Sequence, residues 1–178
     1  MEQIIIENKT FVKYISSQQL NDIIVSLANR INEDYKNKEV VFIVILNGAF
    51  MFAADLFKQI NGLPKISFVK LASYKGEHSS GEVQELIGLN EKIKDKDVII
   101  VEDIVDSGKT MEIILHKLAT MKPKSLEIAS LMFKPGNFTG NYKVKYIGKN
   151  ISNEFIIGYG FDLDGYGRNL KDIYQLKN

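Results

Sequence analysis

The stretch VIIVEDIVDSGKT, residues 98–110, joins an apolar run to three acidic residues and a Ser-Gly-Lys-Thr ending. All four residues at 98–101 are β-branched, which is typical of a strand buried on both faces of a parallel sheet. Beyond the stretch, apolar residues return at helical spacing: Met111, Ile114, Leu115, Leu118 and Met121. The sequence therefore predicts a strand, a loop over residues 102–110 and a helix, the repeating unit of an α/β protein.

The same alternation of strand and helix continues on both sides of this stretch. By the same patterns we expect strands at residues 40–46, 66–71 and 126–133, and helices at residues 20–31 and 52–60. Ser16 and Gln19 are spaced for a capping box at the start of the first helix. Alternating strands and helices predict right-handed crossovers and a mostly parallel sheet flanked by helices.

The C-terminal part of the chain has a different pattern. Its predicted strands are shorter, at residues 144–147 and 155–157, and a Gly-rich acidic segment follows at 159–168. We expect residues 140–178, together with the N-terminal segment, to form a small hood over the carboxyl edge of the sheet. Residues 1–178 would then make one domain.

Composition excludes several classes of function. Lys and Arg number 23 against 22 for Asp and Glu, which argues against binding of nucleic acid or membranes through bulk charge. The chain has no cysteine, so disulfides and thiolate zinc sites are excluded. No segment approaches the ~20 apolar residues of a membrane span, and the N-terminus does not resemble a signal peptide. We therefore expect a cytoplasmic protein without nucleic-acid or membrane partners.

The residues at 102–110 carry the chemistry. Gly108 allows close backbone approach, and hydroxyls of Ser107 and Thr110 with the N–H groups of the next helix suit a phosphate. A triphosphate-binding P-loop would need glycine where Asp103 stands, so that alternative fails. Glu102 and Asp103 suit sugar hydroxyls or Mg²⁺ instead. A ribose 5′-phosphate satisfies both halves, whereas the simpler alternative is an acidic surface turn.

This segment resembles the phosphoribosyl-diphosphate motif of the type I phosphoribosyltransferases, and residues from about 40 to 170 resemble, in order, the hypoxanthine-guanine branch. The resemblance implies the type I phosphoribosyltransferase fold and a purine salvage enzyme with small-molecule substrates. Such an enzyme transfers ribose 5-phosphate from phosphoribosyl diphosphate to a purine, with Mg²⁺ as cofactor. Hypoxanthine would give IMP and guanine GMP, and we expect a homodimer or homotetramer.

Roles for the motif residues follow from the resemblance. Glu102 and Asp103 would hold the ribose hydroxyls and face Mg²⁺. The 5′-phosphate would be cradled by the next residues of the motif: Asp106, Ser107, Gly108, Lys109 and Thr110. Asp106 would also face N7 of the purine as general acid and base, because loss of the imidazole proton makes N9 a better nucleophile.

The pyrophosphate contacts are implied in the same way. Leu46, Asn47 and Gly48 match a short loop in which the family uses a cis peptide. Many members carry lysine where Asn47 stands, so the side-chain charge of that loop is missing here. Arg168 would contact pyrophosphate as well.

The base pocket points to the branch. Lys134, after the strand at 126–133, matches the lysine that donates to the 6-oxo group, and Phe155 matches the aromatic that stacks on the base. The backbone of Ile156 and Asp162 would read the purine edge, and the Asp162 carboxylate would lie near a second Mg²⁺. A lysine donor would exclude adenine, whose 6-amino group is no acceptor.

The polar stretch SYKGEHSSG, residues 73–81, lacks apolar periodicity. Ser73 and Tyr74 match the start of a flexible loop that closes over the site, which would keep water from an oxocarbenium-like transition state. Two alternatives stay open: a xanthine-preferring phosphoribosyltransferase, and a regulator that senses phosphoribosyl diphosphate and binds nucleic acid. The near-zero net charge and the lack of an added DNA-binding domain argue against the regulator.

Overall fold

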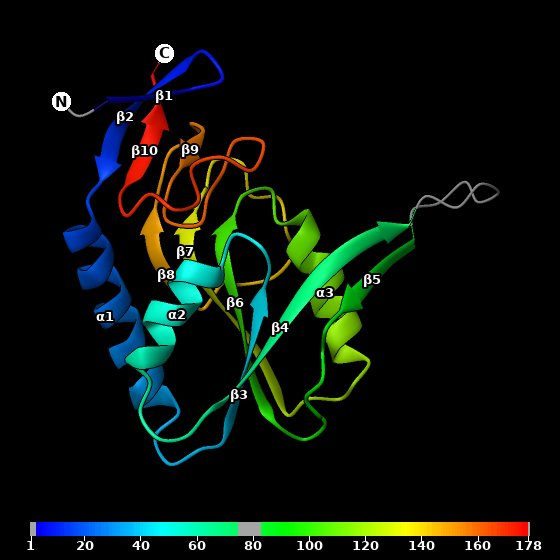
Figure 1. Cartoon of the computed structure of the whole chain (residues 1–178). Helices are drawn as coiled ribbons and strands as arrows, with labels where there is room; N and C mark the ends of the chain where they lie inside the picture. The colour runs from blue at the N-terminus through cyan, green and yellow to red at the C-terminus, as the bar shows by residue number, and fades with distance from the viewer. Residues whose placement is uncertain (1–2, 75–82, 178) are drawn as a thin grey trace.

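A computed structural model of the chain describes residues 3–74 and 83–177, and its main sheet is made of six strands (Figure 1). Their order is β5 (Val83–Ile87), β4 (Lys65–Tyr74), β3 (Val40–Ile45), β6 (Asp97–Val105), β7 (Ser125–Phe133) and β8 (Tyr146–Asn150). All neighbouring pairs are parallel except that of β5 with β4. The predicted mostly parallel sheet is therefore confirmed, with an antiparallel strand at one edge.

Helices cover both faces of this sheet. Helices α1 (Ser17–Asp34) and α2 (Phe50–Lys58) lie on one face, and α3 (Lys109–Ala119) lies on the other (Figure 1). Strand β3 is buried along its whole length, and its side chains alternate between the two layers. Phe42 and Val44 pack with α1 and α2, whereas Val41 and Ile43 pack with α3.

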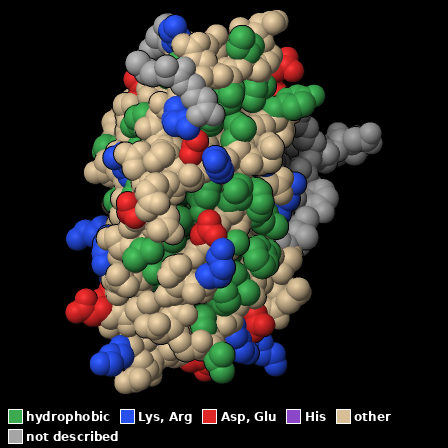
Figure 2. All heavy atoms as spheres, turned by 60° about the vertical axis from the view of Figure 1, so that its left-hand side comes forward, with side chains coloured by type: hydrophobic (Ala, Val, Ile, Leu, Met, Phe, Trp, Pro, Cys, Tyr) green, Lys and Arg blue, Asp and Glu red, His purple; other side chains and the backbone are tan. Residues whose placement is uncertain are grey.

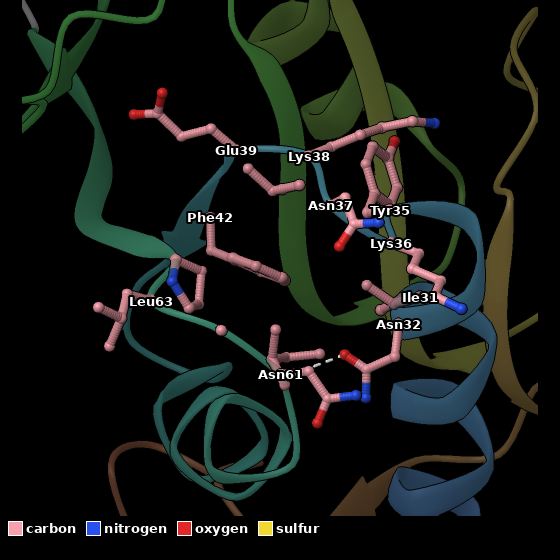
Figure 3. A pocket seen from close by; sticks show the side chains of 14 residues that line it. Ile31, Asn32, Tyr35, Lys36, Asn37, Lys38, Glu39, Phe42, Asn61 and Leu63 are labelled. Carbon is pink, nitrogen blue, oxygen red and sulfur yellow. Dashed lines mark hydrogen bonds between the residues drawn. The ribbon is translucent and has the colours of Figure 1, made fainter.

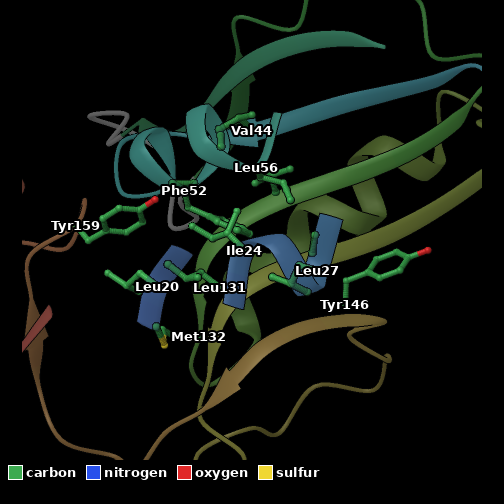
Figure 4. Close-up of a cluster of buried hydrophobic side chains, with 14 of the residues drawn as sticks. Leu20, Ile24, Leu27, Val44, Phe52, Leu56, Leu131, Met132, Tyr146 and Tyr159 are labelled. Atoms are coloured by element: carbon green, nitrogen blue, oxygen red, sulfur yellow. The ribbon is translucent and has the colours of Figure 1, made fainter. Parts of the chain in front are cut away.

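The larger core lies between α1, α2 and the sheet. Figure 4 shows Leu20, Ile24 and Leu27 of α1 meeting Phe52 and Leu56 of α2 over the sheet. These α1 residues recur at helical spacing, so one face of the helix is buried and the other is solvated. No helix in the described ranges is long and apolar enough to cross a membrane.

The N-terminus of α1 has the predicted capping box. The Gln19 backbone N–H donates to Ser16 Oγ at 3.3 Å, and the Ser16 N–H donates to Gln19 Oε1 at 2.9 Å. Two N–H groups that a helix start leaves without partners are thereby satisfied, which stabilises a helix by about 1 kcal/mol. The cap fixes where the chain leaves the preceding strand and enters α1.

A second, antiparallel sheet joins the two ends of the chain. Its order is β1 (Gln3–Ile6), β2 (Lys9–Ile15), β10 (Ile173–Leu176) and β9 (Ile156–Ile157). Figure 1 shows this sheet beyond the carboxyl ends of β6, β7 and β8. Buried Asp172 anchors it, because one carboxylate oxygen accepts from the Ser17 N–H and the other pairs with Lys13, both at 2.7 Å.

Strand β6 differs from its prediction in a way that matters for the site. We expected the strand to end at residue 101, but it continues to Val105. Its pairing with β3 ends at Val101, whereas pairing with β7 goes on through Glu102 and Ile104. The ladder with a single neighbour is enough to keep this backbone extended, although its side chains are polar. The acidic pair therefore lies on the end of a strand and not in the loop.

Other boundaries moved by a few residues. The strand expected at 144–147 is β8, Tyr146–Asn150, because its partner β7 extends to Phe133 and pairs with Asn150. The helix expected at 52–60 is α2, which starts two residues earlier, directly after the turn that follows β3. The strand expected at 155–157 is β9, from which Phe155 is excluded.

Candidate active site

The turn from β6 into α3 forms a small hollow at the carboxyl edge of the sheet. Its volume is about 100 Å³, and its lining residues are Glu102, Ile104, Val105, Asp106, Ser107, Gly108, Thr110 and Met111. Gly108 caps α3 with φ +86° and offers no side-chain bond to the first turn. The N–H groups of that turn therefore remain available to an anion, with the helix dipole in its favour.

Both the backbone conformation and the limited space at position 108 require glycine. Its φ lies in the left-handed region that other residues rarely adopt. A Cβ at this position would lie 2.7 Å from the Phe138 ring and 2.8 Å from Tyr142 Oη. A segment after β7 therefore closes the outer side of the hollow, opposite the place where an anion would bind. The hydroxyls of Ser107 and Thr110 and the start of α3, at Lys109, belong to the same turn, as predicted from the sequence.

Glu102 and Asp103 form a largely buried acidic pair. Glu102 Oε1 accepts from the Asp103 N–H at 3.2 Å, and Asp103 Oδ1 accepts from the Ile104 N–H at 2.9 Å. Burial raises the pKa of Glu102 well above its usual value, and the negative charge of Asp103 adds to the effect. Burial also raises the pKa of Asp103, although hydrogen bonds and the charge of Arg168 oppose it. Two such carboxylates attract a cation or hydroxyl donors.

Asp106 is in the opposite electrostatic state. Its Oδ2 pairs with Lys134 Nζ at 2.9 Å, and its Oδ1 accepts from Asn137 Nδ2 at 2.9 Å. Partial burial alone would raise the pKa of Asp106, but the hydrogen bonds from Lys134 and Asn137, with the charge of Lys134, outweigh it and lower the pKa. Lys134 itself is buried, with a second contact to the Asn153 carbonyl at 3.4 Å. Asp106 is therefore a carboxylate held ionised at the rim of the hollow.

The loop after β3 meets the acidic pair from the side. The Leu46–Asn47 peptide bond is cis, as the family resemblance implied for this position. A Cβ on Gly48 would overlap the Asp103 carboxylate, and a Cβ on Gly160 would overlap the Gly48 carbonyl. Glycine at these two positions lets three segments touch: the 46–48 loop, the end of β6 and the Gly-rich segment near the C-terminus. The Asn47 side chain is exposed.

Arg168 and Asp162 belong to the same Gly-rich segment. Arg168 Nη1 donates to the Gly160 carbonyl at 2.7 Å, and Arg168 Nη2 pairs with Asp162 Oδ1 at 2.6 Å. The other Asp162 oxygen accepts from the Gly165 N–H at 2.7 Å. Arg168 is thus placed beside the 46–48 loop, whereas both Asp162 oxygens have partners within their own segment. Within residues 3–74 and 83–177, no group of three or more His, Cys, Asp or Glu is arranged to hold a metal ion.

The residues assigned to the base lie next to this arrangement. Phe155 is 43% exposed although it is a large aromatic, which leaves one side of its ring open for stacking. Its neighbour Ile156 is buried in β9. The contact of Lys134 with Asn153 connects this segment to Asp106. Ser73 and Tyr74 end β4, and the rest of the loop expected from the sequence, residues 75–81, lies outside the described residues.

Two contacts near the site were not foreseen from the sequence. Asn137 binds Asp106, and nothing in the local pattern distinguishes it from a solvated loop residue. Tyr159 donates from its buried hydroxyl to Asp55 of α2, which ties the Gly-rich segment to the helix that follows the 46–48 loop. Its position between Gly158 and Gly160, all three with positive φ, was the one available signal, since such a run presses backbone close to its neighbours.

Another pocket lies at the amino-terminal side of the sheet, away from these residues. Figure 3 shows it between the end of α1, the start of β3 and the turn around Leu63. The Asn32 side chain there already bonds the Asn61 N–H and the Gln59 carbonyl, both at 2.9 Å. Because ligands of open α/β sheets bind at the carboxyl ends of strands, we assign the chemistry to the hollow beside β6.

The chain is similar to known phosphoribosyltransferases. Residues 14–164 match the phosphoribosyl transferase domain family. The hypoxanthine-guanine phosphoribosyltransferase of Staphylococcus epidermidis is 42% identical over 164 residues, 92% of each chain, and that of Staphylococcus aureus is 38% identical over the same shares. A crystal structure of hypoxanthine-guanine phosphoribosyltransferase from Bacillus anthracis superposes with a TM-score of 0.82 and 34% identity, over 93% of this chain and 96% of that one. For a hypoxanthine phosphoribosyltransferase from Staphylococcus aureus the TM-score is 0.83 and the identity 35%, over 93% and 91% of the chains.

Proposed function

This chain belongs to the phosphoribosyltransferases, in their hypoxanthine-guanine branch, and we propose that it makes IMP from hypoxanthine and GMP from guanine with Mg²⁺ as cofactor. The 5-phosphoribosyl group would pass from phosphoribosyl diphosphate to N9 of the base, releasing pyrophosphate. The branch places the enzyme in purine salvage.

The observation that carries the choice of base is the pairing of Lys134 with Asp106 at 2.9 Å. It puts an ammonium donor and an ionised carboxylate side by side at the rim of the hollow. A 6-oxopurine offers an acceptor at O6 and a proton at N7, two neighbouring groups that match this pair. Adenine has an amino donor at C6 and would face the lysine with the wrong group.

Asp106 acts as the general base in this proposal. Its lowered pKa keeps it ionised at neutral pH, so that it can accept the N7 proton as N9 attacks the ribose. Lys134 keeps the 6-oxo group in place, and Phe155 stacks on the ring. The backbone of Ile156 and Asp162 would complete the edge contacts.

The ribose phosphate would lie across the turn from β6 to α3. Its 5′-phosphate would accept from the N–H groups and hydroxyls of residues 106–110, including Ser107, Lys109 and Thr110. Pyrophosphate would lie along the loop of Leu46, Asn47 and Gly48, with Arg168 as its cationic partner. The position of Asn47 puts a neutral side chain in this loop, so the charge contributed by Arg168 matters more.

The acidic pair fits a Mg²⁺ ion. Glu102 and Asp103 are hard oxygen donors, and burial raises the pKa values of both, with the charge of Arg168 opposing the effect on Asp103. Mg²⁺ is commonly bound by one or two carboxylates together with substrate oxygens and water. When bound, the ion would neutralise charge on the diphosphate as it leaves. A second ion at Asp162 would require this carboxylate to give up its pairing with Arg168.

A base panel tests the proposed function. The protein is incubated with Mg²⁺, phosphoribosyl diphosphate and one of five bases: hypoxanthine, guanine, xanthine, adenine or uracil. Nucleotide formation is followed by ultraviolet absorbance. We expect turnover of hypoxanthine and guanine, with adenine and uracil inert. Turnover of adenine or uracil alone would overturn the base pocket, and preference for xanthine would replace the proposed substrates.

The distribution of charge on one face of the molecule does not favour the hypothesis of a nucleic-acid-binding regulator. Figure 2 shows that lysines and arginines are interspersed with acidic residues on the face turned forward from the left of Figure 1, and no basic stripe follows it. Nucleic-acid binding through phosphates depends on such a stripe and weakens steeply with salt. Salt-sensitive binding of RNA or DNA at micromolar protein, without turnover of any base, would favour the regulator over the enzyme.

A further inference from the structure

The segment that follows β7 runs alongside the turn from β6 to α3 and bonds it residue by residue. Three backbone carbonyls of the turn accept hydrogen bonds from residues 134–142. The bonds are, in order, Lys134 N–H to Val105 O at 3.0 Å, Thr139 N–H and Oγ1 to Ser107 O at 3.1 and 3.2 Å, and Tyr142 Oη to Gly108 O at 2.9 Å. This segment therefore braces the turn from behind.

Asn137 lies in the middle of this brace. Like Lys134, it reaches the carboxylate of Asp106 with its side chain and not the backbone of the turn. Its Nδ2 donates to Asp106 Oδ1 at 2.9 Å, while Lys134 takes Oδ2. The backbone N–H of Asn137 in turn donates to the Lys134 carbonyl at 3.2 Å, so the two donors are joined in one tight turn.

From this geometry we propose that Asn137 is a positioning residue for the reaction, which fixes Asp106 so that its second oxygen meets the N7 proton of the base. The inference rests on the proposed function, because it presumes that Asp106 is the general base. It assigns a task to a residue outside the phosphoribosyl-diphosphate motif.

The two donors to Asp106 differ in what else they would bind, and this difference supports the positioning role. Lys134 must serve two acceptors once a base is bound, the Asp106 carboxylate and the 6-oxo group. The ammonium group has three donors and can bond both acceptors. Its hydrogen bond to Asp106 weakens, however, when it also donates to the base. Asn137 would not have to donate to the base as well. It keeps one carboxylate oxygen in place, and restricting a reacting group to its productive geometry is a large part of catalysis.

The electrostatics of Asp106 agree with the geometry. Partial burial works to raise its pKa, and the hydrogen bonds from Lys134 and Asn137 together reverse this effect. The charge of Lys134, which directly follows β7, also lowers the pKa of Asp106. Removal of the Asn137 donor should therefore raise the pKa of Asp106.

The test compares Asn137→Ala with a matched control. Asn141→Ala makes the same change four residues on, at an exposed side chain that has no hydrogen bond among the described residues. Asn137→Asp is a stronger variant, because a second carboxylate would face Asp106. Two quantities are measured for each protein: the pH profile of kcat/KM for hypoxanthine, and the titration of the Asp106 carboxyl carbon by NMR without ligands. An Asp106→Asn sample assigns the resonance.

For Asn137→Ala we expect kcat/KM for hypoxanthine to fall about 10-fold at pH 7, the scale of one hydrogen bond to a charged group. The acid limb and the carboxyl titration should both move to higher pH, and further in Asn137→Asp. The KM for phosphoribosyl diphosphate should stay within about twofold of the unmodified value, since uniform loss is the mark of a structural defect. Asn141→Ala should match the unmodified protein.

The outcomes separate this inference from the proposed function. Turnover with an unmoved acid limb and an unmoved Asp106 titration in Asn137→Ala would overturn the positioning role alone. Absence of turnover by the unmodified protein would overturn the proposed function. In that event, the NMR titration of the ligand-free protein still decides whether Asn137 controls Asp106.

Discussion

The two ends of the segment from Glu102 to Asp106 hold carboxylates in opposite electrostatic states. At the strand end, burial raises the pKa values of Glu102 and Asp103, and the charge of Asp103 adds to the effect on Glu102. Three residues later, partners outweigh burial and lower the pKa of Asp106. The difference does not come from the acids themselves but from what the fold puts opposite them.

Asp103 faces Gly48, which has no side chain to offer, whereas Asp106 faces Lys134 and Asn137. A buried carboxylate without a cationic partner is unfavourable, so the acidic pair should be the part of the site that changes most on binding a cation or sugar. Asp106 is already held in its working state. The site thus combines an acidic pair that a ligand would neutralise with a carboxylate, Asp106, whose partners are already in place.

The largest effect should come from substitution of Asp106. Asp106→Asn keeps the shape and removes the proposed general base, so kcat/KM should fall about 10²- to 10⁴-fold, with affinity for phosphoribosyl diphosphate nearly unchanged. Steady-state kinetics with both substrates measures this. Asp164→Asn, the same change at an exposed aspartate, is the control. A loss below tenfold in Asp106→Asn would remove Asp106 as the base.

Removal of the ionic partner should have an intermediate effect. Lys134→Ala takes away the donor to the 6-oxo group and leaves Asp106 with Asn137 alone. We expect kcat/KM for hypoxanthine to fall about 10- to 100-fold, as for loss of a hydrogen bond to a charged group. Binding of phosphoribosyl diphosphate, followed by calorimetry, should change little. Equal loss for both substrates would contradict the assignment of Lys134 to the base.

The smallest effect concerns stability at the strand end. A raised pKa in the folded protein means that folding is favoured while Glu102 is protonated and weakens as pH rises above the usual glutamate value of 4.5. Glu102→Gln should therefore raise the free energy of unfolding of the metal-free protein by about 1–2 kcal/mol at pH 7. The gain should vanish at acidic pH, where the glutamate is protonated in both states.

Urea unfolding at several pH values measures that difference. Added Mg²⁺ should stabilise the unmodified protein more than Glu102→Gln, because the variant has lost one of the two proposed oxygen ligands. A destabilised Glu102→Gln at pH 7 in the absence of metal would show that Glu102 is compensated, and the contrast between the two ends would disappear.

Local patterns were sufficient for most of the element order. Apolar runs and helical spacing predicted β3, β4, β6, β7 and the three helices, because burial on one or two faces imposes a period on the sequence. The predicted end of β6 was wrong, because Glu102 and Asp103 interrupt the apolar pattern while the pairing with β7 continues. Pairing depends on a strand that lies elsewhere in the chain, and a single segment does not report it.

The candidate site divides in the same way. The turn at 106–110 could be expected from glycine, hydroxyl residues and a following helix, all of which are local. The contact of Asn137 with Asp106 spans 31 residues, and that of Lys134 with Asp106 spans 28. Lys134 was found through family resemblance, and Asn137 had no signal at all.

By itself, therefore, the sequence determined the order of most strands and helices and the presence, after β6, of a turn whose residue types suit a phosphate, because these follow from periodicity and from residue types at neighbouring positions. Only the tertiary structure decided which carboxylates have partners. Their charge states depend on burial and on groups from other segments, Gly48 opposite Asp103 and Asn137 opposite Asp106. Such proximity arises when parallel strands bring their carboxyl ends to one edge of the sheet.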